Sequence, residues 1–343
     1  MNILIVSEKP SLSRAIAPVA RSHWPADNIT FVHAVPYGNF RFVYPRGLRM
    51  QDYPRVSEPV HGLVSWSRWA CEPLVLDAAG LLTKVQMGEH HFTDADLIVY
   101  ACDPDHTGAV AFDVLMAVVF GDDRAKDCPA MWLDALDELS IRRALARMAP
   151  FRQVAARSLE YGDMKRYFDW NWNVNALAVL GDAARRAGVP TEAPPLSKYS
   201  LQVLYALRDK LPMAEGQIIS LMTKWPGTGR YPYAPGEWRP RVGSAASVAQ
   251  IVQNLVDAGL LSQLLPAGWM GPLQEYRSPP YRLAISDRGR ALLALLHPDC
   301  EDLDLPFRLD AWCNQGAAAK PAIERYIRTF FGKQLRFAAL AQA

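Results

Sequence analysis

Three acidic side chains directly follow two apolar runs in the first third of the chain. Glu8 comes after the run Ile3–Val6, and Asp103 and Asp105 come after the run Leu97–Ala101. Short apolar runs of this kind are typical of strands that are buried on both faces of a parallel sheet. Because side chains after the carboxyl ends of neighbouring parallel strands lie at one edge of the sheet, we expect the three carboxylates to converge.

Converging carboxylates suit a hard divalent cation. Glu8, Asp103 and Asp105 would supply oxygen ligands of the kind that Mg²⁺ accepts, so the sequence predicts a metal site with Mg²⁺ as cofactor. Glu8 and Lys9 are the candidate catalytic residues, with Lys9 placed to oppose a phosphate charge. The alternative is that the Asp-x-Asp pair caps a turn and that Glu8 is a solvated acid. His106 either contacts a phosphate, partly neutralises the acids, or is a solvated loop residue.

The elements that must position these acids alternate between strands and helices. We predict a helix capped by Ser11 and a turn at Tyr37-Gly38. The predicted strands are 3–6, 31–35, 40–43, 97–101 and 131–133, and further helices are 109–120 and 140–148. This order predicts an α/β domain over residues 1–148, with a mostly parallel sheet and flanking helices.

Residues 149–343 form a second, mainly helical domain in this interpretation. Helical patterns cover 151–187, 199–211 and 214–224, and a proline-rich connector runs from Gly188 to Ser197. Segment 245–297 follows the order helix, strand, loop, strand and helix, with Gly259 ending its first helix. That order is typical of a winged-helix unit.

Composition limits the function classes without choosing one. The chain has 343 residues and a formal net charge of +2, so a nucleic-acid site must come from local clusters of cations. Its five cysteines form no CxxC pair, which argues against a zinc ribbon and favours a reducing compartment. We find no signal-peptide pattern and no apolar run of about 18 residues, so we expect a cytoplasmic protein with no membrane partner.

Two clusters combine cations with aromatic residues, a composition that suits single-stranded nucleic acid. The first contains Arg142, Arg143, Arg147, Arg152, Arg157, Lys165 and Arg166, with Tyr161, Tyr167, Phe168, Trp170 and Trp172. The second contains Lys224, Trp225, Arg230, Tyr231, Tyr233, Trp238, Arg239 and Arg241. For each cluster, the alternative is a solvated helix face beside core aromatics.

An ordered series of motifs runs along the chain. The opening NILIVSEKPSLSRAIA and the later TDADLIVYACDPDHTG are similar to the two Toprim motifs of the type IA DNA topoisomerases, especially the topoisomerase III branch. Further similar stretches follow in the family's order: VPYGNFRFVYP, WSRWACEPLVL, AMWLDALDELSIRRAL, Asp169-Trp170 with Val174-Asn175, IISLMTKWPGTGR, SVAQIVQNLVDAGLL, YRLAISDRGRALLALL and FRLDAWCNQG.

The resemblance implies a Toprim-type domain, a helical core and a DNA partner. It adds Asp169 and Asn175 to the candidate DNA-binding residues, which are Lys9, Arg157, Lys165, Arg166, Asp169, Asn175, Lys224, Arg230, Tyr231, Tyr233 and Arg239.

Several positions depart from the family pattern. Ala109 stands where a glutamate helps to hold the metal, Ala178 where an arginine is usual, and Asn39 where a histidine is usual. The family's gate and its nucleophilic tyrosine motif have no counterpart, since only a short connector separates the two helical parts. Tyr231 or Tyr233 could substitute as nucleophile only with a positioned base or cation.

These observations predict a topoisomerase IA-like protein that binds DNA, with a preference for single strands or junctions, without autonomous strand passage. Two alternatives remain open. One is a Mg²⁺-dependent Toprim nuclease or nickase, and the other is a subunit of a split topoisomerase whose protein partner supplies the gate.

Overall fold

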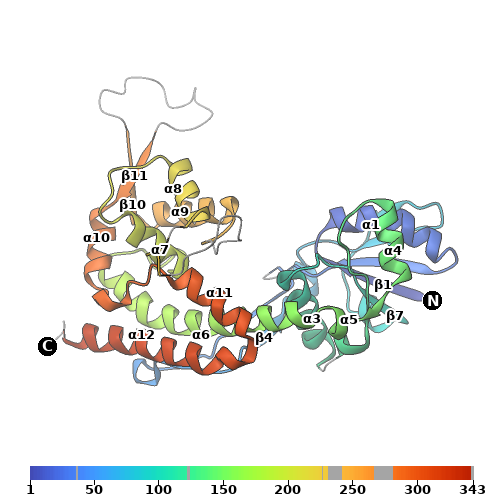
Figure 1. The fold of residues 1–343 in the computed structure, drawn as a ribbon, viewed down its shortest axis with the longest axis horizontal. Coiled ribbons are helices and arrows are strands. Elements are labelled where there is room, and N and C mark those ends of the chain that lie inside the picture. Colours follow the sequence, from blue (N-terminus) through green and yellow to red (C-terminus); the bar gives the residue numbers. More distant parts are fainter. Residues whose placement is uncertain (36–37, 122–123, 226, 231–241, 266–280, 341–343) are drawn as a thin grey trace. The chain divides into compact units, whose positions relative to one another are not determined.

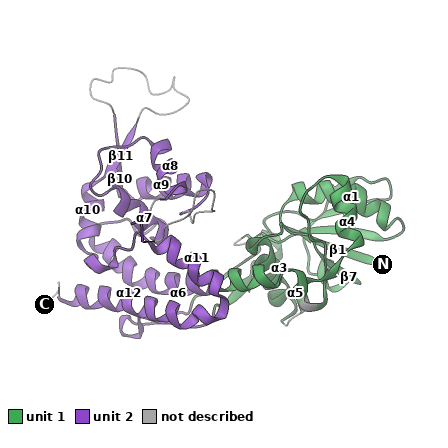
Figure 2. Ribbon diagram, viewed as in Figure 1, with its two compact units in different colours: residues 1–44, 59–166 green, residues 45–58, 167–343 purple. Residues whose placement is uncertain are grey.

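A computed structural model describes residues 1–35, 38–121, 124–225, 227–230, 242–265 and 281–340. The chain divides into two compact units (Figure 2). Unit 1 comprises residues 1–44 and 59–166, and unit 2 comprises residues 45–58 and 167–343. The domain boundary predicted after residue 148 lies before the long helix α6 (Ala156–Arg186), within which the two units divide. That domain assignment stays a prediction.

A seven-stranded sheet forms the centre of unit 1 (Figure 1), in the order β6–β5–β2–β1–β7–β8–β9. The strands are β1 (Asn2–Ser7), β2 (Asn28–His33), β5 (Leu74–Leu76), β6 (Leu82–Lys84), β7 (Leu97–Tyr100), β8 (Pro129–Ala130) and β9 (Ala149–Pro150). The four central strands β2, β1, β7 and β8 are parallel, whereas β5, β6 and β9 pair antiparallel at the sides. A separate two-stranded sheet joins β3 (Phe40–Phe42) to β4 (His61–Leu63).

Helices cover both faces of this sheet. Ile3 and Ile5 of β1 point to the face covered by α1 (Pro10–His23) and α4 (Glu138–Ala146). Leu4 and Val6 point to the opposite face, covered by α3 (His106–Phe120) and α5 (Phe151–Val154). Alternate residues of β1 are therefore apolar on both sides, as a buried parallel strand requires. The predicted mostly parallel sheet with flanking helices is confirmed.

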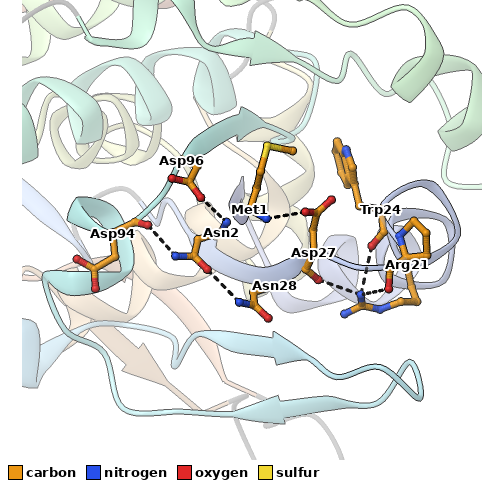
Figure 3. A network of polar contacts seen from close by, with 9 residues as sticks. Met1, Asn2, Arg21, Trp24, Asp27, Asn28, Asp94 and Asp96 are labelled. Atoms are coloured by element: carbon orange, nitrogen blue, oxygen red, sulfur yellow. Dashed lines mark hydrogen bonds and ion pairs between the residues drawn. The ribbon is translucent and has the colours of Figure 1, made fainter.

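A polar network closes the amino-terminal end of the strands (Figure 3). The amino group of Met1 donates to the Asp27 carboxylate at 2.7 Å, and the Asn2 backbone N–H donates to the Asp96 carboxylate at 2.7 Å. The Asn2 side chain also donates to the Asp94 carbonyl at 3.1 Å. These contacts fix the start of β1, and the acidic residues of the predicted site lie after its other end.

Unit 2 is mainly helical, as predicted. It contains the second part of α6 together with α7 (Lys198–Leu207), α8 (Glu215–Thr223), α9 (Ala245–Asp257), α10 (Asp287–Ala294), α11 (Leu305–Gln315) and α12 (Lys320–Leu340). Phe168 and Trp172 of α6 pack against Trp312 of α11 and Phe330 of α12, with the Trp172 and Phe330 ring centroids 4.7 Å apart. In the described part of the chain, no helix is both long and apolar enough to span a membrane.

The segment predicted to be winged-helix-like has the expected order of elements. Helix α9 is followed by β10 (Leu261–Leu264), and β11 (Arg282–Ile285) pairs with it antiparallel before α10. Gly259 ends α9 with a positive φ of 68°, and the Leu260 N–H donates back to the Leu255 carbonyl at 2.8 Å. A left-handed glycine with such a bond is a common helix terminator, which confirms the role predicted for Gly259. The winged-helix assignment itself stays a prediction.

Two asparagines of α6 bind the separate segment 45–58 into unit 2. The Asn175 side chain accepts from the Arg55 N–H and donates to the Arg55 carbonyl, both at 2.7 Å. Asn171 makes the same pair of bonds to the backbone of Ser57, at 2.8 and 3.0 Å. Four helical residues advance about 6 Å and two extended residues about 6.6 Å, so the spacings match. We call this arrangement the asparagine clasp.

Several predicted element boundaries are wrong. Helix α1 begins at Pro10 with Lys9 as its N-cap, because proline already has the backbone angle of a first helical residue, so Ser11 is no cap. The strand predicted at 131–133 lies instead at 129–130. Met131 and Leu133 are buried beneath the helices that cover this face, so the apolar run there indicated burial and not strand pairing. The turn predicted at Tyr37-Gly38 includes Tyr37, which lies outside the described residues.

Replacement of Asn175 by alanine should destabilise unit 2. The N–H and carbonyl of Arg55 would lose their partner, which costs about 2–4 kcal/mol for two backbone groups left unpaired. Urea unfolding followed by circular dichroism measures this free energy. Asn314→Ala, which alters an exposed asparagine of α11, is the control and should change stability by less than about 0.5 kcal/mol. Equal effects of the two variants would show that the clasp contributes nothing.

Candidate functional site

The predicted acids come together because β1 and β7 are adjacent and parallel. Val6 is the register partner of Tyr100, so the chain leaves both strands at the same edge of the sheet. Glu8 follows two residues after Val6 and Asp103 three residues after Tyr100. The charges of Asp103 and Asp105 both act on Glu8. This convergence is what the sequence predicts.

Asp105 caps the helix that follows β7. Its carboxylate accepts from the Thr107 N–H at 2.8 Å and from the Gly108 N–H at 2.9 Å, which satisfies two of the free donors at the start of α3. A Cβ atom on Gly108 would lie only 2.5 Å from the Asp103 carbonyl oxygen. Glycine is therefore needed for the helix to begin this close to the acidic turn.

Lys9 neutralises part of the acidic charge. Its ammonium group lies 2.7 Å from the Asp103 carboxylate, in a pair whose side chains are 51% and 32% exposed. An ion pair this exposed contributes little to stability, since water competes for both partners. It also leaves Lys9 accessible to an incoming anion.

Glu8 is the perturbed group of the site. The pKa of its carboxyl group is raised to about 7, first by burial, then by the charges of Asp103 and Asp105 and by a side-chain hydrogen bond with Asp103, while the charge of Lys9 lowers it. The buried Oε2 atom of Glu8 has no hydrogen-bond partner among the described residues. This acid therefore keeps its proton to a higher pH than an ordinary carboxyl group does, and a proton or a cation would stabilise it.

A buried polar chain supports the start of this turn. The hydroxyl groups of Ser7 and Ser13 lie 2.9 Å apart, and the Ser13 hydroxyl lies 3.1 Å from His33 Nε2. Burial lowers the pKa of His33 to about 4, and the charge of Arg14 acts in the same direction, so this histidine is neutral. The sequence analysis did not predict these contacts among Ser7, Ser13 and His33. Their signal was the presence of polar residues within otherwise apolar runs.

The donor chemistry of the site fits a hard cation, but the arrangement is incomplete. Three carboxylates meet at the edge, and Glu8 Oε2 is buried without a partner. Within the described residues, however, no group of three or more His, Cys, Asp and Glu side chains is placed to hold a metal ion. Lys9 pairs with Asp103 Oδ2, and Asp105 accepts both capping hydrogen bonds with Oδ1. A cation would have to displace Lys9 from Asp103.

His106 lies beside an aromatic ring from α6. The ring centroids of His106 and Tyr161 are 4.7 Å apart. The residue after Tyr161 is Gly162, which packs closely against α3. A Cβ atom on Gly162 would lie 2.2 Å from a Val110 methyl carbon and 3.0 Å from the His106 carbonyl oxygen. Gly162 thus lets α6 approach α3 within unit 1.

Most aromatic residues of the first basic cluster belong to the core, which corrects their predicted role as stacking surfaces. Tyr167, Phe168, Trp170 and Trp172 are at most 3% exposed, because the helices of unit 2 pack around this part of α6. Tyr161 is the half-buried exception.

The cations of the first cluster have different surroundings. Arg157 is exposed, and Lys165 and Arg166 are half-buried. The Arg166 guanidinium lies over the Phe40 ring at 5.4 Å. Arg152 pairs with Asp113 at 2.7 Å.

The structure gives Asp169 and Asn175 internal partners. Asp169 is buried and ion-paired with Lys198 at 2.5 Å. Asn175 is fully buried in the asparagine clasp. Neither side chain is exposed for a direct contact with DNA.

The second basic cluster lies partly outside the described residues. Lys224 and Arg230 are exposed. Trp225 is buried and donates to the Leu303 carbonyl at 2.6 Å, so it is a core residue. The remaining members Tyr231, Tyr233, Trp238, Arg239 and Arg241 lie outside the described residues.

A stretch of the chain is similar to a DNA topoisomerase. That relative is DNA topoisomerase 1 of Aeropyrum pernix, which is 38% identical to this chain over 112 residues. The match covers 32% of this chain and 16% of the relative, so the similarity extends over about a sixth of that protein's length. No protein-family model matches the chain.

Replacement of Glu8 by glutamine should remove a pH dependence of stability. Because the pKa of Glu8 rises from 4.5 to about 7 on folding, the folded chain binds more protons between these values, and its stability falls as pH rises through that window. Glu8→Gln mimics the protonated acid. It should match the wild type below about pH 4.5 and exceed it at pH 8 by about 1 kcal/mol after allowance for solvent screening.

Thermal unfolding at a series of pH values provides the measurement. Glu72→Gln is the matched control, because Glu72 is 58% exposed and pairs with Lys84 at the surface. A stability difference between Glu8→Gln and the wild type that does not change with pH would contradict the described environment of Glu8.

Proposed function

We propose that this protein is a topoisomerase IA-like DNA-binding protein that holds single strands or junctions and does not pass strands by itself. The main support is the edge of the sheet where β1 and β7 end, because Lys9, Glu8 and Asp103 lie together there. Part of the chain is also similar to a DNA topoisomerase. In this proposal unit 1 is a Toprim-type domain and the segment 245–297 is a winged-helix unit.

Exposed cations supply the sequence-independent part of binding. Lys9 adds its charge at the sheet edge, where the amino-terminal end of α1 also favours an anion. Arg157, Lys224 and Arg230 are exposed and free to follow a phosphate backbone. The buried aromatics leave base stacking to fewer side chains than the sequence suggests.

The lack of strand passage rests on the short connector between α6 and α7. Residues 187–197 cannot form an arch wide enough for DNA, since eleven extended residues span at most about 40 Å. A protein partner that supplies the gate would make this chain one subunit of a split topoisomerase.

We propose that this protein acts in the cytoplasm.

DNA binding should depend steeply on salt and survive removal of two acids. Fluorescence anisotropy with a labelled single strand should give a negative slope of log K against log salt. Asp103→Ala with Asp105→Ala should keep or increase the affinity, because two charges that repel phosphate are lost. Lys224→Ala with Arg230→Ala should reduce the magnitude of the slope by about 2, one for each lost phosphate contact.

Arg185→Ala with Arg186→Ala is the matched control, since both residues are exposed at the end of α6 and lie outside the two clusters. We expect this control to leave the slope unchanged. Absence of DNA affinity at low salt in the wild type would contradict the proposal.

A Mg²⁺-dependent nuclease or nickase is the second candidate. The observation that favours it is the partnerless, buried Oε2 atom of Glu8 beside two further carboxylates. Glu8, Asp103 and Asp105 would hold the ion, which supplies an activated water for attack on a phosphodiester. Lys9, once released from Asp103, would pair with the phosphate and hold it in place.

Magnesium should stabilise the wild type only if this site binds it. At pH 8, Mg²⁺ should raise the Tm of the wild type and not that of Glu8→Gln, because a ligand stabilises the folded state that binds it. Supercoiled DNA incubated with Mg²⁺ or Mn²⁺ should be nicked by the wild type and by Glu72→Gln, but not by Glu8→Ala. No Tm change and intact DNA with both metals would exclude this candidate.

A further inference from the structure

Helix α12 carries more positive charge than the chain as a whole. Its 21 residues include five cations and one acid, a net charge of +4, whereas the whole chain has a net charge of +2. The remainder of the chain is therefore net negative. Neither of the two basic clusters described above includes this helix. A local excess of cations along one helix is the usual electrostatic sign of a nucleic-acid site.

Three arginines share the exposed side of α12. Arg325, Arg328 and Arg336 are all exposed, and none of them forms an ion pair with a residue that the structure describes. Since successive residues of a helix are about 100° apart, the three arginines fall within an arc of about 80°. Thr329 and Gly332, which lie between them on this side, have small side chains. We call this side of the helix the arginine face.

The other charged residues of α12 already have partners. Lys320 and Lys333 are ion-paired with acids of other segments. Glu324, the only acid of the helix, accepts a hydrogen bond from the Tyr167 hydroxyl at 2.8 Å. The charge of the arginine face is thus left for a partner outside the described part of the chain.

The opposite side of α12 is buried in unit 2, where the helix lies beside α6 (Figure 1). Ile323, Ile327 and Phe331 are fully buried, and the ring of Phe330 packs on Trp172 at 4.7 Å between centroids. A helix that binds a membrane surface inserts its apolar side into the lipid. Because the apolar side of α12 is already occupied, the arginine face does not suit a membrane.

We infer that the arginine face of α12 binds the phosphate backbone of double-stranded DNA. Its uncompensated positive charge complements a polyanion, and guanidinium groups form strong paired hydrogen bonds with phosphate. The inference rests on the proposed function, since a junction contains duplex arms beside its single strands.

Two features favour a duplex over other polyanions. No aromatic residue of α12 is exposed, so this face lacks the stacking surface of a single-strand site and an apolar anchor for a protein interface. Arg325 and Arg336 are about 16 Å apart along the helix axis, which allows them to reach phosphates on both sides of a major groove about 12 Å wide.

Fluorescence anisotropy of the full chain tests this inference with a labelled duplex of about 20 base pairs, a single strand of the same length, and a fork made from both. Arg325→Gln with Arg328→Gln and Arg336→Gln should reduce the magnitude of the duplex slope of log K against log salt by about 3, one for each lost phosphate contact. The single-strand slope should change by less than about 1. Because glutamine and arginine have similar helix propensities, the Tm should stay the same.

Arg49→Gln with Arg185→Gln and Arg186→Gln is the matched control. It removes the same charge from three exposed positions of unit 2 outside α12, and it should leave both slopes unchanged. Two duplexes of different sequence should lose affinity equally in the α12 variant, since phosphate contacts carry no sequence information.

The outcomes separate this inference from the proposed function. A duplex slope that the α12 variant leaves unchanged overturns the inference, and single-strand or fork binding by the wild type then keeps the proposed function. Duplex binding that depends on α12, without binding of the single strand or the fork, overturns the proposed function alone. No binding of any of the three DNAs at low salt overturns both.

Other occupants of the arginine face give different results. Equal reductions of the duplex and single-strand slopes would contradict a duplex site. Binding to polyglutamate or to phosphatidylserine vesicles that the α12 variant loses, with its duplex slope unchanged, would assign the face to an acidic protein or a membrane and overturn the inference.

Discussion

The parallel pairing of β1 with β7 is the constraint on which the candidate site depends. Because Val6 lies opposite Tyr100, the two chains leave the sheet together and bring Glu8 and Asp103 to one edge. Carboxylates held this close repel one another, and burial adds to the cost of charging Glu8. Lys9 offsets part of that repulsion. The pairing of the two strands thus holds together carboxylates whose charges repel one another.

Unit 2 is organised around buried polar groups in the same way. Asn171 and Asn175 are poor helix formers, yet α6 accommodates them because each binds a complete peptide group of segment 45–58. The same helix carries Asp169, which is ion-paired with Lys198, and Trp172, whose ring packs against Phe330. Helix α6 therefore carries both the polar side chains that bind segment 45–58 and the aromatic side chains that pack in the core of unit 2.

The sheet and the convergence of its acids could be predicted because both follow from local rules. Apolar runs indicate buried strands, and parallel strands end together. The roles of Asn175 and Trp172 could not be predicted, since they depend on which distant segments cover α6. Arg55 is 120 positions away from Asn175, and hydrophobic periodicity carries no information about such a partner. A basic helix rich in aromatics looks the same in sequence whether its rings face a core or a ligand.

The excursion of residues 45–58 also governs how the protein can be dissected. The chain enters unit 2, returns to unit 1 and enters unit 2 again, so unit 2 is not one continuous stretch of sequence. A fragment that begins at Tyr167 would lack the peptide groups that Asn171 and Asn175 hold. Complementation by a synthetic peptide of residues 45–58, or a circular permutation that joins it to the fragment, is the route to studying unit 2 in isolation.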